Sequence, residues 1–228
     1  MLNQALYGPG PDEEIVGVAG TDTVQRGSVH RLRPTKWLND EVIHFFLTTL
    51  ARREAHLSKD RPRQLRCRFY KSFFMTKLLG QGGYRYANVR RWSRKVHGKD
   101  IFALDKIICP INCGGMHWTC AVIDMQKRRI QFYDSLLGSG MDYLKSLMEY
   151  LKDEHRNKFK KELDTSNWEL LDCQPNTPQQ ENGYDCGVFT CMFADYLSRD
   201  MPLTFNQANV TECRQRIALS IVNGCALY

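Results

Sequence analysis

The chain has 228 residues, with a hydrophobic fraction of 43% and an aromatic fraction of 11%, which is enough for one folded core and argues against disorder. No apolar run approaches the roughly 18 residues of a membrane span, and we find no secretory signal, so we expect no membrane association. The formal net charge of +7 is read first as a solvated basic surface. An acidic protein partner is an alternative, and nucleic acid stays a minor hypothesis because no motif for it accompanies the charge.

We expect one domain over residues 1–228, and the elements of the first half of the chain come first. Residues 1–20 contain GPGPDEE and are expected to form a loosely ordered extension. A short strand is predicted at residues 21–25. A helix is predicted at residues 37–56, because apolar side chains recur on one face at helical spacing. The apolar side chains of this face are Ile43, Phe46, Leu47 and Leu50.

The next segments predict smaller elements. Residues 63–74 read as a strand that runs into a short helix over residues 74–79, and a cluster of glycines ends that helix. Residues 84–96 predict a surface helix. The basic stretch 51–68 reads as a long loop that could alter the choice of partner.

The second half alternates strands and helices. Three β-rich segments occupy residues 105–111, 117–125 and 128–135, and a short polar link joins the last two as in a hairpin. The rest of the chain predicts a long helix, one more strand and two final helices, over residues 141–163, 168–174, 186–198 and 207–222. The expected class is α+β, with helices around one mixed or antiparallel sheet.

The nine cysteines argue for a reducing, intracellular environment, because their number is odd and no signal peptide is seen. No C-x-x-C spacing occurs. Cys109 and Cys113 lie near His117, so a metal site is conceivable, but the spacing is poor for zinc. We therefore expect no metal, and most of these thiols should pack as small apolar residues.

Cys186 has a different setting. It follows the turn-forming run QENGYD and directly precedes a helical apolar pattern. Unpaired backbone N–H groups and the helix dipole at this position favour a thiolate, which is the nucleophilic form of cysteine. Cys173 and Cys191 lack this placement. The alternative is that Cys186 is one more buried structural thiol.

A cysteine nucleophile needs a histidine, and the histidine needs an orienting partner. The other five histidines lie in polar helical or loop segments, whereas His117 begins a strong strand after a glycine loop. Asp134 ends the next strand, so the predicted hairpin places His117 beside Asp134. A structural histidine and a turn-forming aspartate remain the alternatives for these two residues.

Gln179 and Gln180 precede Cys186 in the same loop. A side-chain amide from this position, together with the backbone N–H of Cys186, could form an oxyanion hole. The alternative is a polar loop that happens to contain glutamines.

The stretches WLNDE, HW, YDS and PQQENGYDCGVFTC occur in this order and resemble the ubiquitin-like-specific protease family, the sentrin-specific or SUMO proteases. GYRYANVRRWSRKV and FADYLSRDMPLTFNQ extend the resemblance, which covers roughly residues 5–225. It implies a papain-like cysteine protease fold, with a mixed central sheet flanked by helices and the nucleophile at a helix N-terminus.

The resemblance also implies roles for individual residues. Cys186 would be the nucleophile and His117 the general base, which later protonates the leaving amine. Asp134 would orient His117. Gln180 would donate to the oxyanion in preference to Gln179.

For substrate binding, the resemblance implies that Trp37 and Trp118 form a narrow tunnel around the Gly-Gly tail of the modifier. Only glycine lacks a side chain, so two indoles that close over the backbone exclude larger residues. Core packing is the alternative for each tryptophan. Asp40 would pair with a basic residue of the modifier. Asn39 or Asp40 can also cap the helix that begins here.

The implied function is that of a SUMO-specific cysteine protease, which matures SUMO precursors and removes SUMO from substrate lysines. Its partners would be SUMO and SUMO-conjugated proteins. No cofactor is needed, and we expect a monomer in the nucleus. The alternatives are a protease for another ubiquitin-like modifier, a catalytically silent modifier-binding module and a basic nucleic-acid-binding domain.

Overall fold

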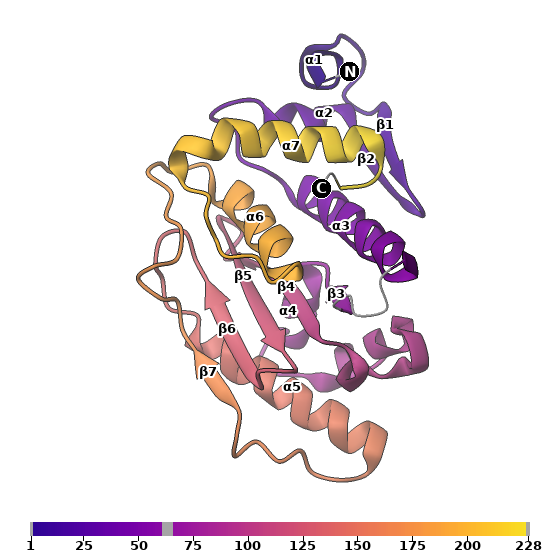
Figure 1. The fold of residues 1–228 in the computed structure, drawn as a ribbon, viewed down its shortest axis with the longest axis vertical. Coiled ribbons are helices and arrows are strands. Elements are labelled where there is room, and N and C mark those ends of the chain that lie inside the picture. Colours follow the sequence, from indigo (N-terminus) through magenta and orange to yellow (C-terminus); the bar gives the residue numbers. More distant parts are fainter. Residues whose placement is uncertain (1, 61–65, 227–228) are drawn as a thin grey trace.

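The computed structural model describes residues 2–60 and 66–226, in which a five-stranded mixed sheet lies between two groups of helices (Figure 1). The strand order is β3-β4-β5-β6-β7, with the three central strands antiparallel and each outer strand parallel to its neighbour. The strands are β3 (Cys67–Phe69), β4 (Lys106–Cys113), β5 (His117–Asp124), β6 (Arg129–Tyr133) and β7 (Glu169–Leu171). The expected α+β class with a mixed sheet is confirmed.

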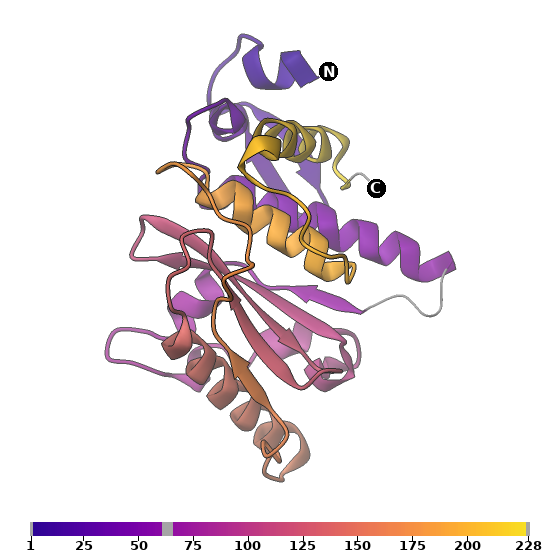
Figure 2. The ribbon, with the colours of Figure 1, turned by 60° about the vertical axis from the view of Figure 1, so that its left-hand side comes forward.

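The helices lie on both faces of the sheet. In both views of the ribbon, α6 lies over the sheet and next to α3 and α7, while α5 covers the opposite face (Figures 1 and 2). The helices are α1 (Leu2–Tyr7), α2 (Arg26–Val29), α3 (Asp40–Asp60), α4 (Phe73–Leu78), α5 (Met141–Phe159), α6 (Cys186–Ser198) and α7 (Val210–Asn223). Among the described helices we find none with an apolar stretch long enough to cross a membrane.

The central strand β5 separates two hydrophobic cores because successive side chains of a strand point to opposite faces. Trp118, Cys120 and Val122 belong to the core under α3, α6 and α7. Ala121 and Ile123 belong to the core under α4 and α5. A strand that is buried on both faces reads as a continuous apolar run, as HWTCAVID does.

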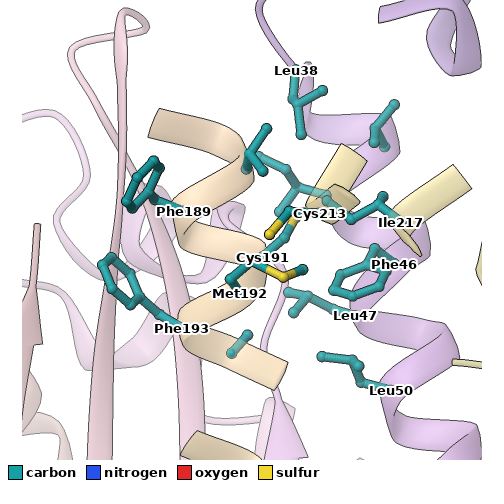
Figure 3. Close-up of a cluster of buried hydrophobic side chains, with 14 of the residues drawn as sticks. Leu38, Phe46, Leu47, Leu50, Phe189, Cys191, Met192, Phe193, Cys213 and Ile217 are labelled. Carbon is teal, nitrogen blue, oxygen red and sulfur yellow. The ribbon is translucent and has the colours of Figure 1, made fainter. Parts of the chain in front are cut away.

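Helix α6 packs one side against the sheet and the other against α3 and α7. Figure 3 shows Phe189 and Phe193 on the side of α6 that faces the strands, and Phe46 and Leu47 on α3 across from it. All four side chains are buried. This packing fixes the start of α6, and therefore Cys186, relative to the end of the sheet.

Asn39 provides the N-terminal cap of α3, since its Oδ1 accepts a hydrogen bond from the amide of Val42 at 3.1 Å. The alternative cap, Asp40, is exposed at the first position of the helix. The four predicted apolar residues of this helix are buried, as expected.

The predicted surface helix at 84–96 is wrong. The chain forms two short 3₁₀ turns instead, at Tyr86–Asn88 and Trp92–Lys95. Trp92 packs edge-on against Phe74, and Tyr86 donates a hydrogen bond to Glu154 on α5. These contacts are made to two different elements, which one straight helix would not reach together.

Two further expectations need correction. Residues 2–20 are more regular than the expected loose extension, because they contain α1 and the strand β1 (Ile15–Ala19), which pairs with β2 (Asp22–Gln25). Leu6 of α1 is buried. The expected loop at 51–68 is helical up to Asp60, and Cys67 begins β3; residues 61–65 lie outside the described residues.

Candidate active site

The candidate site lies where the start of β5, the end of β6 and the start of α6 meet. His117 is the first residue of β5, Asp134 follows β6, and Cys186 is the first residue of α6. The Nε2 of His117 lies 2.7 Å from Oδ1 of Asp134. The contact that the hairpin geometry predicts is therefore present.

The imidazole of His117 also contacts the thiol of Cys186. Its hydrogen bonds with Asp134 and then with Cys186 raise the pKa of His117 from 6.5 to about 10, although burial acts in the opposite direction. Because Nε2 is turned to Asp134, Nδ1 is the ring nitrogen left for the sulfur. A protonated imidazole beside the sulfur favours the thiolate.

Asp134 is itself held in one orientation. Burial acts to raise its pKa, but hydrogen bonds from His117 and from the amides of Leu136 and Gly138 keep the pKa below the usual 3.8. The two amides lie 2.8 and 3.0 Å from the carboxylate oxygens. The carboxylate is thus ionised and fixed, as an orienting partner must be.

Cys186 is buried, with 4% of its surface exposed. The carbonyl of Asp185 accepts hydrogen bonds from the amides of Val188 and Phe189, and no side chain caps the helix. Among the described residues, the amide of Cys186 has no acceptor. It is therefore free to donate to a ligand next to the sulfur.

Gln180 is buried near the end of β6. Its Oε1 accepts a hydrogen bond from the hydroxyl of Ser135 at 2.7 Å, and its Nε2 donates to the carbonyl of Asn182 at 2.5 Å. Gln179 is exposed, with no side-chain hydrogen bond among the described residues. The structure thus distinguishes the two glutamines by giving Gln180 a defined amide orientation.

The two tryptophans differ in exposure. Trp118 is buried and its Nε1 donates to the carbonyl of Leu38 at 3.2 Å, whereas Trp37 is 45% exposed. The hydrogen bond ties the residue next to Trp37 to the strand that begins with His117. The side chain of Leu38 also packs against Gly187 in the first turn of α6. The segment that carries Trp37 is therefore anchored beside Cys186.

Arg214 is a residue that sequence reasoning missed. It is buried on α7, and its Nε and Nη2 donate to Oδ1 of Asp185 at 3.1 and 2.5 Å. Its Nη1 donates to the carbonyls of Arg31 and Arg33, and its Nη2 to that of Lys36. One guanidinium thus holds both the residue before the nucleophile and the segment that leads to Trp37.

The second carboxylate oxygen of Asp185 also accepts hydrogen bonds. Its Oδ2 accepts hydrogen bonds from the side-chain amides of Asn182 and Gln207 at 2.7 and 3.0 Å. A signal for Arg214 existed in the sequence. It shares the apolar face of α7 with Cys213 and Ile217, and a basic residue on an apolar face predicts a buried partner.

Cys109 is fully buried on one face of β4, and we find no cluster of three metal-binding side chains in the described part of the chain. His44 is buried, and its Nε2 is hydrogen-bonded to the amide and the hydroxyl of Ser72.

Known proteins of similar sequence belong to one protease family. The family model described as "Ulp1 protease family, C-terminal catalytic domain" matches residues 36–226. Ubiquitin-like-specific protease 1A of Arabidopsis thaliana is 40% identical over 193 residues, which are 84% of this chain and 38% of that protein. Sentrin-specific protease 2 of Homo sapiens is 34% identical over 223 residues, which are 97% of this chain and 36% of that protein.

Solved structures of Ulp1 protease domains also resemble this chain. The C-terminal Ulp1 protease domain in complex with SMT3, the yeast orthologue of SUMO, superposes with a TM-score of 0.77 at 29% identity, over 98% of this chain and 92% of that one. Ulp1 with its catalytic cysteine oxidised to a sulfenic acid superposes with a TM-score of 0.76 at 31% identity, over 97% and 92% of the two chains. The chain spans well under half the length of the two curated relatives.

Proposed function

The chain belongs to the Ulp1 protease family, and we propose on this premise that it is a SUMO-specific cysteine protease. It cleaves the bond after the C-terminal Gly-Gly of SUMO. The bond is a peptide bond in the SUMO precursor and an isopeptide bond in a conjugate with a substrate lysine. We assign this activity to a single catalytic domain over residues 1–228.

One observation carries the proposal. The thiol of Cys186, at the start of a helix, contacts the imidazole of His117. The Nε2 of that imidazole lies 2.7 Å from Oδ1 of Asp134. This is the arrangement of nucleophile, base and orienting group that cysteine-dependent acyl transfer requires.

The reaction proceeds through a thioester. Cys186 gives its proton to His117, and the sulfur attacks the carbonyl carbon of the last glycine. The tetrahedral oxyanion is bound by the amide of Gln180 and the backbone N–H of Cys186. The C–N bond then breaks, the leaving amine takes the proton from His117, and water that His117 activates hydrolyses the thioester and restores the thiol.

Substrate selection is assigned to the segment around Trp37. Trp37 and Trp118 enclose the Gly-Gly tail, and their indoles leave no space for a side chain. Asp40 pairs with a basic residue of SUMO. Support for this comes from the exposure of both Trp37 and Asp40 and from the anchoring of Leu38 between Trp118 and Gly187.

The proposal extends to the setting of the protein. The partners are SUMO and SUMO-conjugated proteins, the protein acts as a monomer, and its location is nuclear. Support for the partner comes from the relatives, because one similar structure is a complex of Ulp1 with the yeast orthologue of SUMO.

A panel of modifiers tests the proposal. SUMO, ubiquitin and other ubiquitin-like modifiers, each with a fluorogenic amide at its C-terminus, are incubated with the wild type and with Cys186→Ser. We expect SUMO to be cleaved with the highest kcat/KM, and the variant to lose about 10³-fold or more in kcat. Cys225→Ala, which changes a half-buried thiol near the chain end, serves as the control and should retain activity.

A second measurement locates the nucleophile. SUMO with a C-terminal vinyl sulfone is incubated with the protein, and the adduct is mapped by mass spectrometry. An adduct on Cys186 is expected. Faster cleavage of another modifier would refute the SUMO assignment, and an adduct on a different cysteine would refute the mechanism.

A further inference from the structure

Ser135 joins the end of β6 to the loop that precedes the nucleophile. It directly follows Asp134 and is 1% exposed. Its hydroxyl donates to Oε1 of Gln180 at 2.7 Å, and its carbonyl accepts the amide of Gln180 at 3.0 Å. The same serine therefore holds both the backbone and the side chain of Gln180.

These contacts decide which way the Gln180 amide points. The carbonyl of Asn182 can only accept, so the atom 2.5 Å from it must be the Nε2 of Gln180. The other amide atom is then Oε1, and the Ser135 hydroxyl is its donor. A reversed amide would place two carbonyl oxygens against each other.

The fixed orientation leaves one N–H available. A primary amide carries two N–H donors, and among the described residues Nε2 of Gln180 has one acceptor, the carbonyl of Asn182. Asn182 is itself held, because its Oδ1 accepts from the amides of Tyr184 and Asp185. The second N–H thus has a direction that the surrounding contacts determine.

We propose that Ser135 is a positioning residue, which fixes the Gln180 amide so that its remaining N–H points to the oxyanion formed beside Cys186. The inference rests on the proposed function. A donor that is oriented before the reaction stabilises the developing charge without reorganisation. Ser135 connects Asp134, which orients the base His117, with Gln180, which donates to the oxyanion. This serine therefore holds both residues in place relative to the sulfur of Cys186.

Removal of the hydroxyl should act on the chemical step. In Ser135→Ala the Oε1 of Gln180 lacks a donor, and the amide can reverse and turn its oxygen to the oxyanion. Loss of one oxyanion donor costs about 10²–10³-fold in kcat. We therefore expect Ser135→Ala to lower kcat by about tenfold or more, but by less than Gln180→Ala, with KM nearly unchanged.

A double-mutant cycle tests the coupling. The fluorogenic SUMO substrate is used with the wild type, Ser135→Ala, Gln180→Ala and the double variant. We expect the double variant to have the kcat of Gln180→Ala, because Ser135 has no further effect once its target is gone. Ser139→Ala is the matched control, since its exposed hydroxyl donates to Asp172 instead, and its kcat should be unchanged.

Two readouts separate positioning from a general structural role. A SUMO aldehyde forms a tetrahedral adduct with the thiol, and its affinity should fall in Ser135→Ala in parallel with kcat. The pH profile of alkylation by iodoacetamide reports the thiolate of Cys186 and should stay as in the wild type. Ser135→Cys keeps a weak donor and should have an intermediate kcat, which also covers the case in which the alanine variant does not fold.

The outcomes distinguish the two proposals. If the wild type cleaves SUMO but the losses of Ser135→Ala and Gln180→Ala multiply in the double variant, Ser135 does not act through Gln180. A loss confined to KM or to thermal stability would contradict the inference in the same way. A wild type that cleaves no modifier would instead refute the proposed function.

Discussion

Each cysteine owes its chemistry to its surroundings. Burial raises the pKa of the thiols of Cys109, Cys120 and Cys191, so these stay protonated and pack as apolar groups. Cys186 is also buried, but it contacts the imidazole of His117 and lies at a helix start. An identical side chain is thus a core residue in one place and a candidate nucleophile in another.

The His117–Asp134 pair should make stability depend on pH. Folding raises the pKa of His117 from 6.5 to about 10, so its contribution is complete below 6.5 and is lost as the pH rises to 10. Folding lowers the pKa of Asp134 from 3.8, so its contribution is lost on acidification below that value. The pair therefore stabilises the fold most between about pH 4 and 6.5.

Urea unfolding of the wild type and of Asp134→Asn, measured from pH 4 to pH 10, checks the prediction. The difference in unfolding free energy should be largest near pH 5 to 6 and should narrow toward pH 10. The same variant should lose orders of magnitude in kcat with little change in SUMO binding. A difference in stability that stays constant from pH 5 to 10 would show that the pair is not ionised as described.

Among the elements, α6 closely approaches the segment that leads into α3. A Cβ added to Gly187 would lie 2.8 Å from the Cβ of Leu38, which is a rigid part of a buried side chain. Glycine is thus required for the two elements to approach this closely. The same approach places Leu38 within reach of Trp118.

Gly187→Ala should therefore destabilise the protein and disturb the site. We expect a loss of about 1–3 kcal/mol in unfolding free energy, because one extra methyl group forces a shift in a packed core. Turnover should fall as the segment with Trp37 moves. Urea unfolding and kcat/KM on SUMO measure both effects.

Gly183→Ala is the control for this change. A Cβ at Gly183 meets nothing within 4 Å. The unfolding free energy of Gly183→Ala should therefore stay within about 0.5 kcal/mol of the wild-type value. Equal stability of Gly187→Ala and Gly183→Ala would mean that the contact with Leu38 relaxes without cost.

At the scale of the whole molecule, Arg214 connects parts that are far apart in the sequence. It joins the last helix, the loop before Cys186 and the segment from Arg31 to Lys36. The ion pair with Asp185 is buried, with 4% and 2% of the two side chains exposed. Removal of one partner from such a pair leaves a buried charge without compensation.

Arg214→Met should lower the unfolding free energy by about 3–5 kcal/mol. Arg214→Lys should restore little of it, because an ammonium group cannot reproduce the planar fork that reaches three carbonyls and a carboxylate. Gln215→Met, at the exposed neighbouring position, should have little effect. Chemical denaturation of the three variants checks this, and a stable Arg214→Met would show that the pair is not a structural link.

By itself, the sequence determined the elements with strong local patterns. The apolar face of α3 follows from its helical period, β5 and β6 follow from two β-rich segments joined by a short polar link, and the turn before Cys186 follows from the run QENGYD. Because a hairpin brings the start of one strand beside the end of the next, even the His117–Asp134 contact was predictable. The roles assigned to the site residues remain predictions.

Tertiary structure alone decided the rest. Residues 84–96 form 3₁₀ turns, the N-terminal segment is ordered, and Arg214, Ser135 and Gly187 support the site. The reason is physical. Periodicity records which face of an element is apolar, but it does not record which distant side chain or carbonyl will lie against that face once the chain is closed.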